Sequence, residues 1–224
     1  DGVNVDSSPY VKALTFADVN GDGALDLVVG SYDGTIKVRM NSGSDTWPTE
    51  AIGAANPFAG VNVGSTAAPT FTDVNGDGAL DLVVGSGDGT IKVRLNSGSD
   101  TWPTEAIGAA NPFDGVNVGF AARPTVADVN GDGALDLVVG SSICGTITVW
   151  LNSGSDTWPI VPSANPFDGV NVGSCAALTV ADVNGDGALD LVVASSDGTI
   201  KVRLNSNSGS DTWPTEALGA ANPF

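Results

Sequence analysis

Asp-Val-Asn-Gly-Asp-Gly-Ala-Leu-Asp-Leu-Val-Val occupies residues 18–29 and returns unchanged at 73–84, 128–139 and 182–193. Successive copies start 55, 55 and 54 residues apart. A fixed period of this size indicates a propeller or an array of stacked units, because one unit cannot bury its apolar face alone. The sequence therefore predicts a single domain, 1–224, of four repeats at approximately 1–58, 59–113, 114–167 and 168–224.

The second repeat shows the strands expected in every repeat. A short extended segment, 69–72, precedes the acidic stretch, and the apolar run 82–85 follows it. An Asp-Gly turn separates this run from the β-branched segment 90–95, which is a strong hairpin signal. Segment 102–107 is a weaker candidate for a fourth, outer strand. Since no window has a helical period, we expect an all-β fold, a four-bladed β-propeller with four strands per blade.

The two ends of the chain favour closure of these blades into a ring. The chain ends with Asn-Pro-Phe at 222–224 and starts with Asp-Gly-Val-Asn-Val at 1–5. Within the chain these two segments follow one another directly, at 111–118. An open solenoid would show atypical capping units, and none is obvious.

The acidic stretch between the first and second strands predicts a calcium site. Each copy has Asp, Asn, Asp and Asp at positions 1, 3, 5 and 9, Gly at 4 and 6, and at 7 an Ala whose carbonyl can bind. Oxygen ligands around a tight turn suit Ca²⁺. An EF-hand would need Glu at position 12, where these copies have Val, and the toxin nonapeptide recurs every nine residues, so neither fits.

A simple Asx-rich turn is the alternative explanation. However, three clustered carboxylates without a basic neighbour in the loop would repel one another unless a cation were bound. We therefore expect about four Ca²⁺ ions, one per blade. The predicted ligands are Asp18, Asn20, Asp22, Ala24 and Asp26; Asp73, Asn75, Asp77, Ala79 and Asp81; Asp128, Asn130, Asp132, Ala134 and Asp136; and Asp182, Asn184, Asp186, Ala188 and Asp190.

The charge of the chain restricts its partners. Its formal net charge is −18, from 26 acidic and 8 basic residues, so nucleic acid is an unsuitable partner. Apolar runs such as 27–29 are far shorter than a membrane span. Calcium loops are typical of the outside of the cell, so we expect a secreted or cell-surface protein that does not span a membrane.

The motif Asp-x-Asn-Gly-Asp-Gly-x-x-Asp-Leu between two strands, once per repeat, resembles the FG-GAP/VCBS repeats of integrin α-subunit propellers and of bacterial and algal surface proteins. It is also similar to the fungal propeller lectins built on this repeat. The resemblance covers all four units. It implies Ca²⁺ in the loops between the first and second strands, and extracellular recognition, adhesion or glycan binding without catalysis. Those relatives have seven blades and this chain has four, so only the calcium ligands carry over by position.

Differences among the repeats point to a candidate binding face. They fall largely in the segment before the first strand and in the turn between the second and third strands. In an up-and-down blade both connections emerge opposite the calcium loops. This face collects aromatic and basic residues, namely Tyr10, Lys12, Tyr32, Phe120 and Arg123. Neutral variation of surface loops explains the same differences equally well.

Tryptophans and cysteines supply two further hypotheses. Each repeat carries Ser-Asp-Thr-Trp-Pro, and these tryptophans could stack on sugar rings or, the interpretation we favour, pack at the blade edge: Trp47, Trp102, Trp158 and Trp213. Cys144 and Cys175 lie in the variable regions of neighbouring blades, so we expect a disulfide between them.

Catalysis is not expected. The chain contains no His, no nucleophile elbow and no phosphate loop, and most carboxylates belong to the calcium loops. Two hypotheses remain. The first is a calcium-stabilised, non-catalytic extracellular module that binds a glycan or a protein. The second is a structural subunit of a larger extracellular or surface assembly, in which calcium supplies rigidity.

Overall fold

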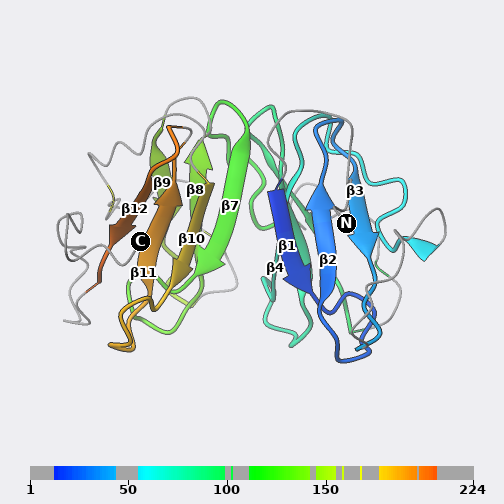
Figure 1. Ribbon diagram of the computed structural model, residues 1–224, viewed down its shortest axis with the longest axis horizontal. Coiled ribbons are helices and arrows are strands. Elements are labelled where there is room, and N and C mark those ends of the chain that lie inside the picture. The colour runs from blue at the N-terminus through cyan, green and yellow to red at the C-terminus, as the bar shows by residue number, and fades with distance from the viewer. Residues whose placement is uncertain are drawn as a thin grey trace. The chain divides into compact units, whose positions relative to one another are not determined.

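The regular structure of the chain consists of β-strands. A computed structural model describes residues 13–43, 55–98, 102, 111–141, 145–154, 158, 167, 177–195 and 197–205. Its strands form four three-stranded sheets, one per repeat, which we call blades 1 to 4 (Figure 1). Blade 1 contains β1 (Ala13–Ala17), β2 (Asp26–Gly30) and β3 (Ile36–Arg39); blade 2 contains β4 (Ala68–Thr72), β5 (Asp81–Gly85) and β6 (Ile91–Arg94). Blade 3 contains β7 (Ala122–Ala127), β8 (Asp136–Ser141) and β9 (Ile147–Trp150); blade 4 contains β10 (Ala177–Ala181), β11 (Asp190–Ala194) and β12 (Ile200–Arg203).

Each blade is an antiparallel meander with its second strand in the middle. In blade 1, Ala17 pairs with Asp26 at the end where the acidic loop joins β1 to β2, and Gly30 pairs with Ile36 at the opposite end. The all-β fold and the first three strands of each repeat are confirmed. The predicted fourth strand at 102–107 lies, apart from Trp102, outside the described residues. The predicted ring closure rests on terminal segments that are also outside them, and it stays a prediction.

Contacts divide the chain into two compact units, Asp1–Asn117 and Val118–Phe224. In the first unit, one side of blade 1 packs against one side of blade 2. We call the side that a blade turns toward the following repeat its trailing face; in blade 1 it consists of Ala17, Val28, Ile36 and Val38. We call the other side the leading face; in blade 2 it consists of Pro69, Phe71, Leu82 and Val84.

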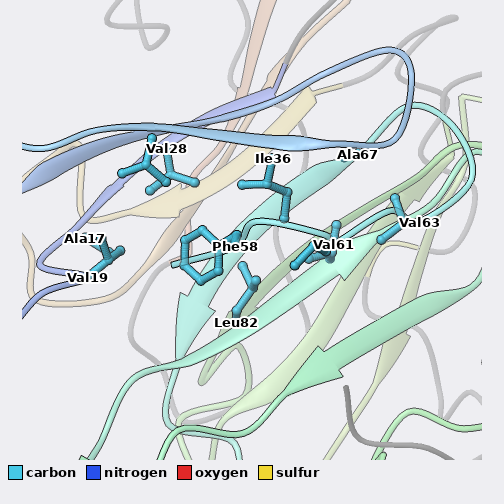
Figure 2. Packing of buried hydrophobic residues seen from close by; sticks show 11 residues of the cluster. Ala17, Val19, Val28, Ile36, Phe58, Val61, Val63, Ala67 and Leu82 are labelled. Atoms are coloured by element: carbon cyan, nitrogen blue, oxygen red, sulfur yellow. The ribbon is translucent and has the colours of Figure 1, made fainter. Parts of the chain in front are cut away.

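The side chain of Phe58 fills the space between these two faces. It is among the largest fully buried side chains of the described residues, and Figure 2 shows it among the aliphatic side chains of both blades. Asn56 positions it, because its amide donates to the carbonyl of Ile36 (2.9 Å) and its Oδ1 accepts the N–H of Phe58 (2.9 Å). The Asn-Pro-Phe motif therefore serves the core.

The second unit repeats this arrangement. Its core joins the trailing face of blade 3, including Val138, Ile147 and Val149, to Leu191 and Val193 of blade 4. Phe167 is buried there in the position that Phe58 has in the first unit. Among the described residues no helix has the length and hydropathy of a membrane span.

Gly30 sets how closely blade 2 approaches blade 1. A Cβ at Gly30 would lie 2.0 Å from the carbonyl oxygen of Ala67 and 2.7 Å from Cδ of Pro69. The carbonyl belongs to the backbone, so this overlap can be relieved only by moving the segment that leads into β4. Glycine is required here by close approach.

We predict that Gly30→Ala lowers the free energy of unfolding by about 1–3 kcal/mol, because the added methyl overpacks the contact between the blades. Urea unfolding followed by tryptophan fluorescence measures the change. Ala194→Gly is the control, because Ala194 occupies the same strand position in blade 4; it should cost no more than about 1 kcal/mol. An unchanged unfolding free energy for Gly30→Ala would contradict this packing.

Candidate functional site

A buried carboxylate at position 9 of the acidic loop holds each blade together. Both oxygens of Asp26 accept backbone N–H groups, one from Val19 after β1 (3.1 Å) and one from Asn41 after β3 (2.6 Å). The same pair of bonds recurs in every blade. All four of these side chains are fully buried: Asp26, Asp81, Asp136 and Asp190.

The first Asp of the loop folds the turn around itself. The carboxylate of Asp18 accepts the N–H groups of Gly21 (2.8 Å), Asp22 (3.1 Å) and Gly23 (2.8 Å). These bonds recur in the other three loops with equivalent partners. Gly21 and Gly23 have φ angles of 75° and 88°, which explains why glycine occupies positions 4 and 6.

The middle of the loop is also cross-linked. Asn20 donates to Asp22 Oδ2 (3.0 Å) and accepts the N–H of Asp22 (3.0 Å), while Asp22 Oδ1 accepts the N–H of Ala24 (2.9 Å). Each loop thus has a defined shape before any cation is considered.

The donor set fits a hard cation. An ionised carboxylate offers about four lone-pair sites, and the hydrogen bonds above occupy three at Asp18 and two at Asp22. Oxygen atoms of Asp18, Asn20 and Asp22 therefore retain capacity for Ca²⁺. In the described part of the chain, however, no group of three acidic, His or Cys side chains is arranged to hold a metal ion. The loop carboxylates instead accept hydrogen bonds from backbone N–H groups.

The electrostatics of the loop also favour an added positive charge. Burial raises the pKa of Asp136 to about 6, against the lowering effect of the N–H groups of Asn152 and Val129; the charges of Asp132 and Asp128 raise it further. The pKa values of the equivalent Asp26 and Asp81 are raised for the same reasons. A nearby cation would lower these pKa values, because it stabilises the ionised carboxylates against the effects of burial and of mutual repulsion.

An asparagine after the third strand completes the loop and was not singled out from the sequence. Besides its N–H bond to Asp26, Asn41 donates its side-chain amide to the carbonyl of Leu25 (3.2 Å). Asn96 makes the same contact with Leu80 (3.3 Å). The signal was present, because an Asn follows the third strand in every repeat: Asn41, Asn96, Asn152 and Asn205.

The opposite end of the first unit brings the variable segments together. We call this surface, made by 31–35, 62–66 and 86–87, the connection end. Thr66 N–H donates to the carbonyl of Tyr32 (2.9 Å), and Gly87 N–H donates to the carbonyl of Ser65 (2.7 Å). Segment 62–66 is therefore bonded to the turns of both blade 1 and blade 2.

This end carries backbone strain. Among the described residues, Thr66 and Ala121 are the non-glycine residues with positive φ, at 49° and 44°, and they occupy the same position in successive repeats. Such strain costs on the order of 1–3 kcal/mol per residue and persists only where surrounding contacts enforce it. The backbone bonds of Thr66 to Tyr32 and of Ser65 to Gly87 supply such contacts in the first unit.

The candidate binding residues differ in exposure, and several of them lie outside the described residues. Tyr32 is 48% exposed at the connection end of the first unit. In the second unit, Phe120 is 49% exposed, its carbonyl accepts the hydroxyl of Ser141 (3.2 Å), and Arg123 is partly buried in β7. Tyr10, Lys12 and Trp213 lie outside the described residues, as do Cys144 and Cys175 of the expected disulfide.

The described tryptophans lie in packed surroundings. The indole N–H of Trp102 donates to the carbonyl of Val19 (3.0 Å), and its ring meets Phe58 and Phe71 edge-on, with centroids 4.9 and 5.7 Å away. Trp102 thus links the second repeat to the acidic loop of the first. Trp158 is buried, and Trp47 lies outside the described residues.

Comparisons with known proteins agree with this architecture. The FG-GAP-like repeat matches at residues 18–84, 73–139, 128–193 and 182–224. No curated protein matches the chain. A solved structure of an Agrocybe aegerita lectin, described as recognising non-reducing terminal N-acetylglucosamine, is similar with 23% identity and a TM-score of 0.50, over 95% of this chain and 53% of the lectin chain.

The structure of BBS1N in complex with ARL6DN is also similar, with 16% identity and a TM-score of 0.45, over 88% of this chain and 54% of that chain. The chain thus spans about half the length of both structures. Matches to the repeat extend over most of the chain, from residue 18 to residue 224. The chain therefore belongs to the FG-GAP repeat family of β-propeller proteins.

Proposed function

We propose that this protein is a calcium-stabilised, non-catalytic recognition module that binds a glycan or a protein at its connection end. The observation that carries this proposal is the bonding of segment 62–66 to the turns of two blades. Residues that differ among the repeats, such as Tyr32 and Ser65, are thereby held side by side on a rigid backbone. Rigidity before binding lowers the entropic cost of recognition.

A glycan suits this surface. Tyr32 offers an exposed aromatic ring with a hydroxyl group, and such rings combine apolar contact with hydrogen bonding. The similarity to a propeller that recognises terminal N-acetylglucosamine makes this sugar the first ligand to test. Catalysis has little support, because the chain has no His and the loop carboxylates are committed to backbone N–H groups.

The proposal assigns one Ca²⁺ to each acidic loop. Side-chain oxygens at positions 1, 3, 5 and 9 and the carbonyl at position 7 would hold it. The bound ion would stabilise the charged form of the carboxylates, which burial and mutual repulsion disfavour. Millimolar Ca²⁺ is found outside the cell, so a secreted or cell-surface location follows. A fourth strand in each blade and a disulfide between Cys144 and Cys175 belong to the same proposal.

Chelation should destabilise the protein strongly. With a Kd of ~0.1 mM, calcium at ~1 mM contributes ~1.4 kcal/mol per site and ~6 kcal/mol over four sites. We predict that EDTA lowers Tm by roughly 10–20 °C in differential scanning calorimetry. Asp77→Asn, at an exposed loop ligand, should remove about a quarter of the calcium effect. Asp114→Asn, outside the loops, should retain all of it, and equal melting in EDTA and calcium would disprove the role of the ion.

The metal-free protein should lose stability as the pH rises. The folded-state pKa of Asp136 is raised, so its contribution is fully present below its ordinary pKa and is lost as the pH rises through about 6. In EDTA, the unfolding free energy attributable to this group should fall between about pH 4 and pH 7. Carboxyl NMR should give Asp136 a midpoint near 6. A midpoint at the ordinary Asp value would contradict the structure.

Binding should depend on the connection end. We predict that a glycan array containing terminal N-acetylglucosamine gives calcium-dependent binding, and that Tyr32→Ala weakens it at least about tenfold, or 1.4 kcal/mol. Leu25→Ala is the matched control, because Leu25 is exposed beside the acidic loop at the opposite end. An array without signal would disfavour a glycan ligand, and equal losses for both variants would exclude the connection end. A silent array together with a stable oligomer would favour the structural role.

A further inference from the structure

Met40, the single methionine of the sequence, directly follows the third strand of blade 1. The other three repeats have leucine at this position: Leu95, Leu151 and Leu204. All four side chains are partly exposed, and Met40 packs against the core of the first unit. Leucine and methionine replace one another at little cost in such packing. The packing therefore does not require the thioether, which is a chemical difference confined to blade 1.

The sulfur of Met40 contacts a side chain of the acidic loop. The amide nitrogen Nδ2 of Asn20 donates toward Sδ of Met40 over 4.0 Å. The same nitrogen donates to Oδ2 of Asp22 (3.0 Å), and a side-chain amide has two N–H groups, so it can serve both partners. A thioether is a weak acceptor, so the contact with Met40 contributes little while the sulfur is reduced.

The backbone on either side of Met40 is fixed. Arg39 before it is the last residue of β3 and pairs with the central strand. Asn41 after it donates its backbone N–H to the buried carboxylate of Asp26 (2.6 Å). Met40 is thus held in place between two anchored residues, with its sulfur against Asn20. A chemical change at this sulfur would act directly on position 3 of the loop.

We propose that Met40 is an oxidation site whose sulfoxide oxygen is bound by the side-chain amide of Asn20. Hydrogen peroxide supplies the oxygen: a sulfur lone pair forms the S–O bond, the O–O bond breaks, and the second oxygen leaves as hydroxide. This hydroxide takes the remaining proton and becomes water, so the sulfur is oxidised by two electrons and the peroxide is reduced by two. The product is methionine sulfoxide, which methionine sulfoxide reductases convert back.

Oxidation would strengthen the contact between the loop and the end of β3. A sulfoxide oxygen is a better acceptor than a thioether and extends one bond beyond the sulfur. The 4.0 Å contact of Asn20 with the sulfur can therefore become a hydrogen bond of ordinary length to oxygen. The acidic loops of the other repeats have leucine in place of Met40 and cannot respond in this way. Because the effect concerns the metal-free loop, it does not depend on the proposed calcium site.

Peroxide treatment of the full chain in EDTA tests the proposal. Peptide mass mapping should find one added oxygen on Met40. NMR should show the side-chain amide of Asn20 shifted downfield, with its solvent exchange slowed at least about threefold by the new hydrogen bond. The side-chain amide of Asn75, in the equivalent loop beside Leu95, is the internal control and should not change. Methionine sulfoxide reductases should restore the original Asn20 signal.

Two variants separate this contact from a general effect of peroxide. Met40→Leu gives blade 1 the residue of the other repeats and should abolish the response of Asn20. Met40→Leu combined with Leu95→Met should transfer the response to Asn75. Circular dichroism of each variant verifies folding. A Met40 that stays reduced in the native protein, at peroxide concentrations that oxidise the unfolded chain, would overturn the oxidation site. An oxidised Met40 with an unchanged Asn20 amide would overturn the bond to the loop.

Discussion

One buried carboxylate per repeat holds the blade together. Asp26 joins the residue after β1 to the residue after β3, so the three strands meet at a single side chain. Burying a carboxylate is costly, and two N–H donors offset this only in part, as the raised pKa of the equivalent Asp136 shows. A cation in the adjacent loop would supply the missing charge. The packing of the blade and the proposed calcium site therefore depend on the same residue.

The two ends of a blade differ in how closely the four repeats resemble one another. At the loop end the sequence is the same in all four repeats, and so is the pattern of hydrogen bonds. At the connection end the repeats differ, and segment 62–66 bonds to two turns. Repetition thus provides stability, and the departures from it provide a surface that is available for recognition.

The period and the loop chemistry made most of the fold predictable. Alternating apolar residues and the Asp-Gly turn were enough for the first three strands of each repeat. The sequence did not reveal that the Asp at position 9 is a fully buried partner for two backbone N–H groups, because a ligand and a structural carboxylate look alike in a motif. The burial of Trp150, at a position where the other repeats have Arg, was not predicted from the sequence either.

In the proposed function, each acidic loop holds one calcium ion. Isothermal titration of the metal-free protein with calcium counts these ions directly. We predict about four ions bound per chain, and one fewer when Asp22 is replaced by Ala. A titration without saturable binding, or with the same number of ions in that variant, would contradict it.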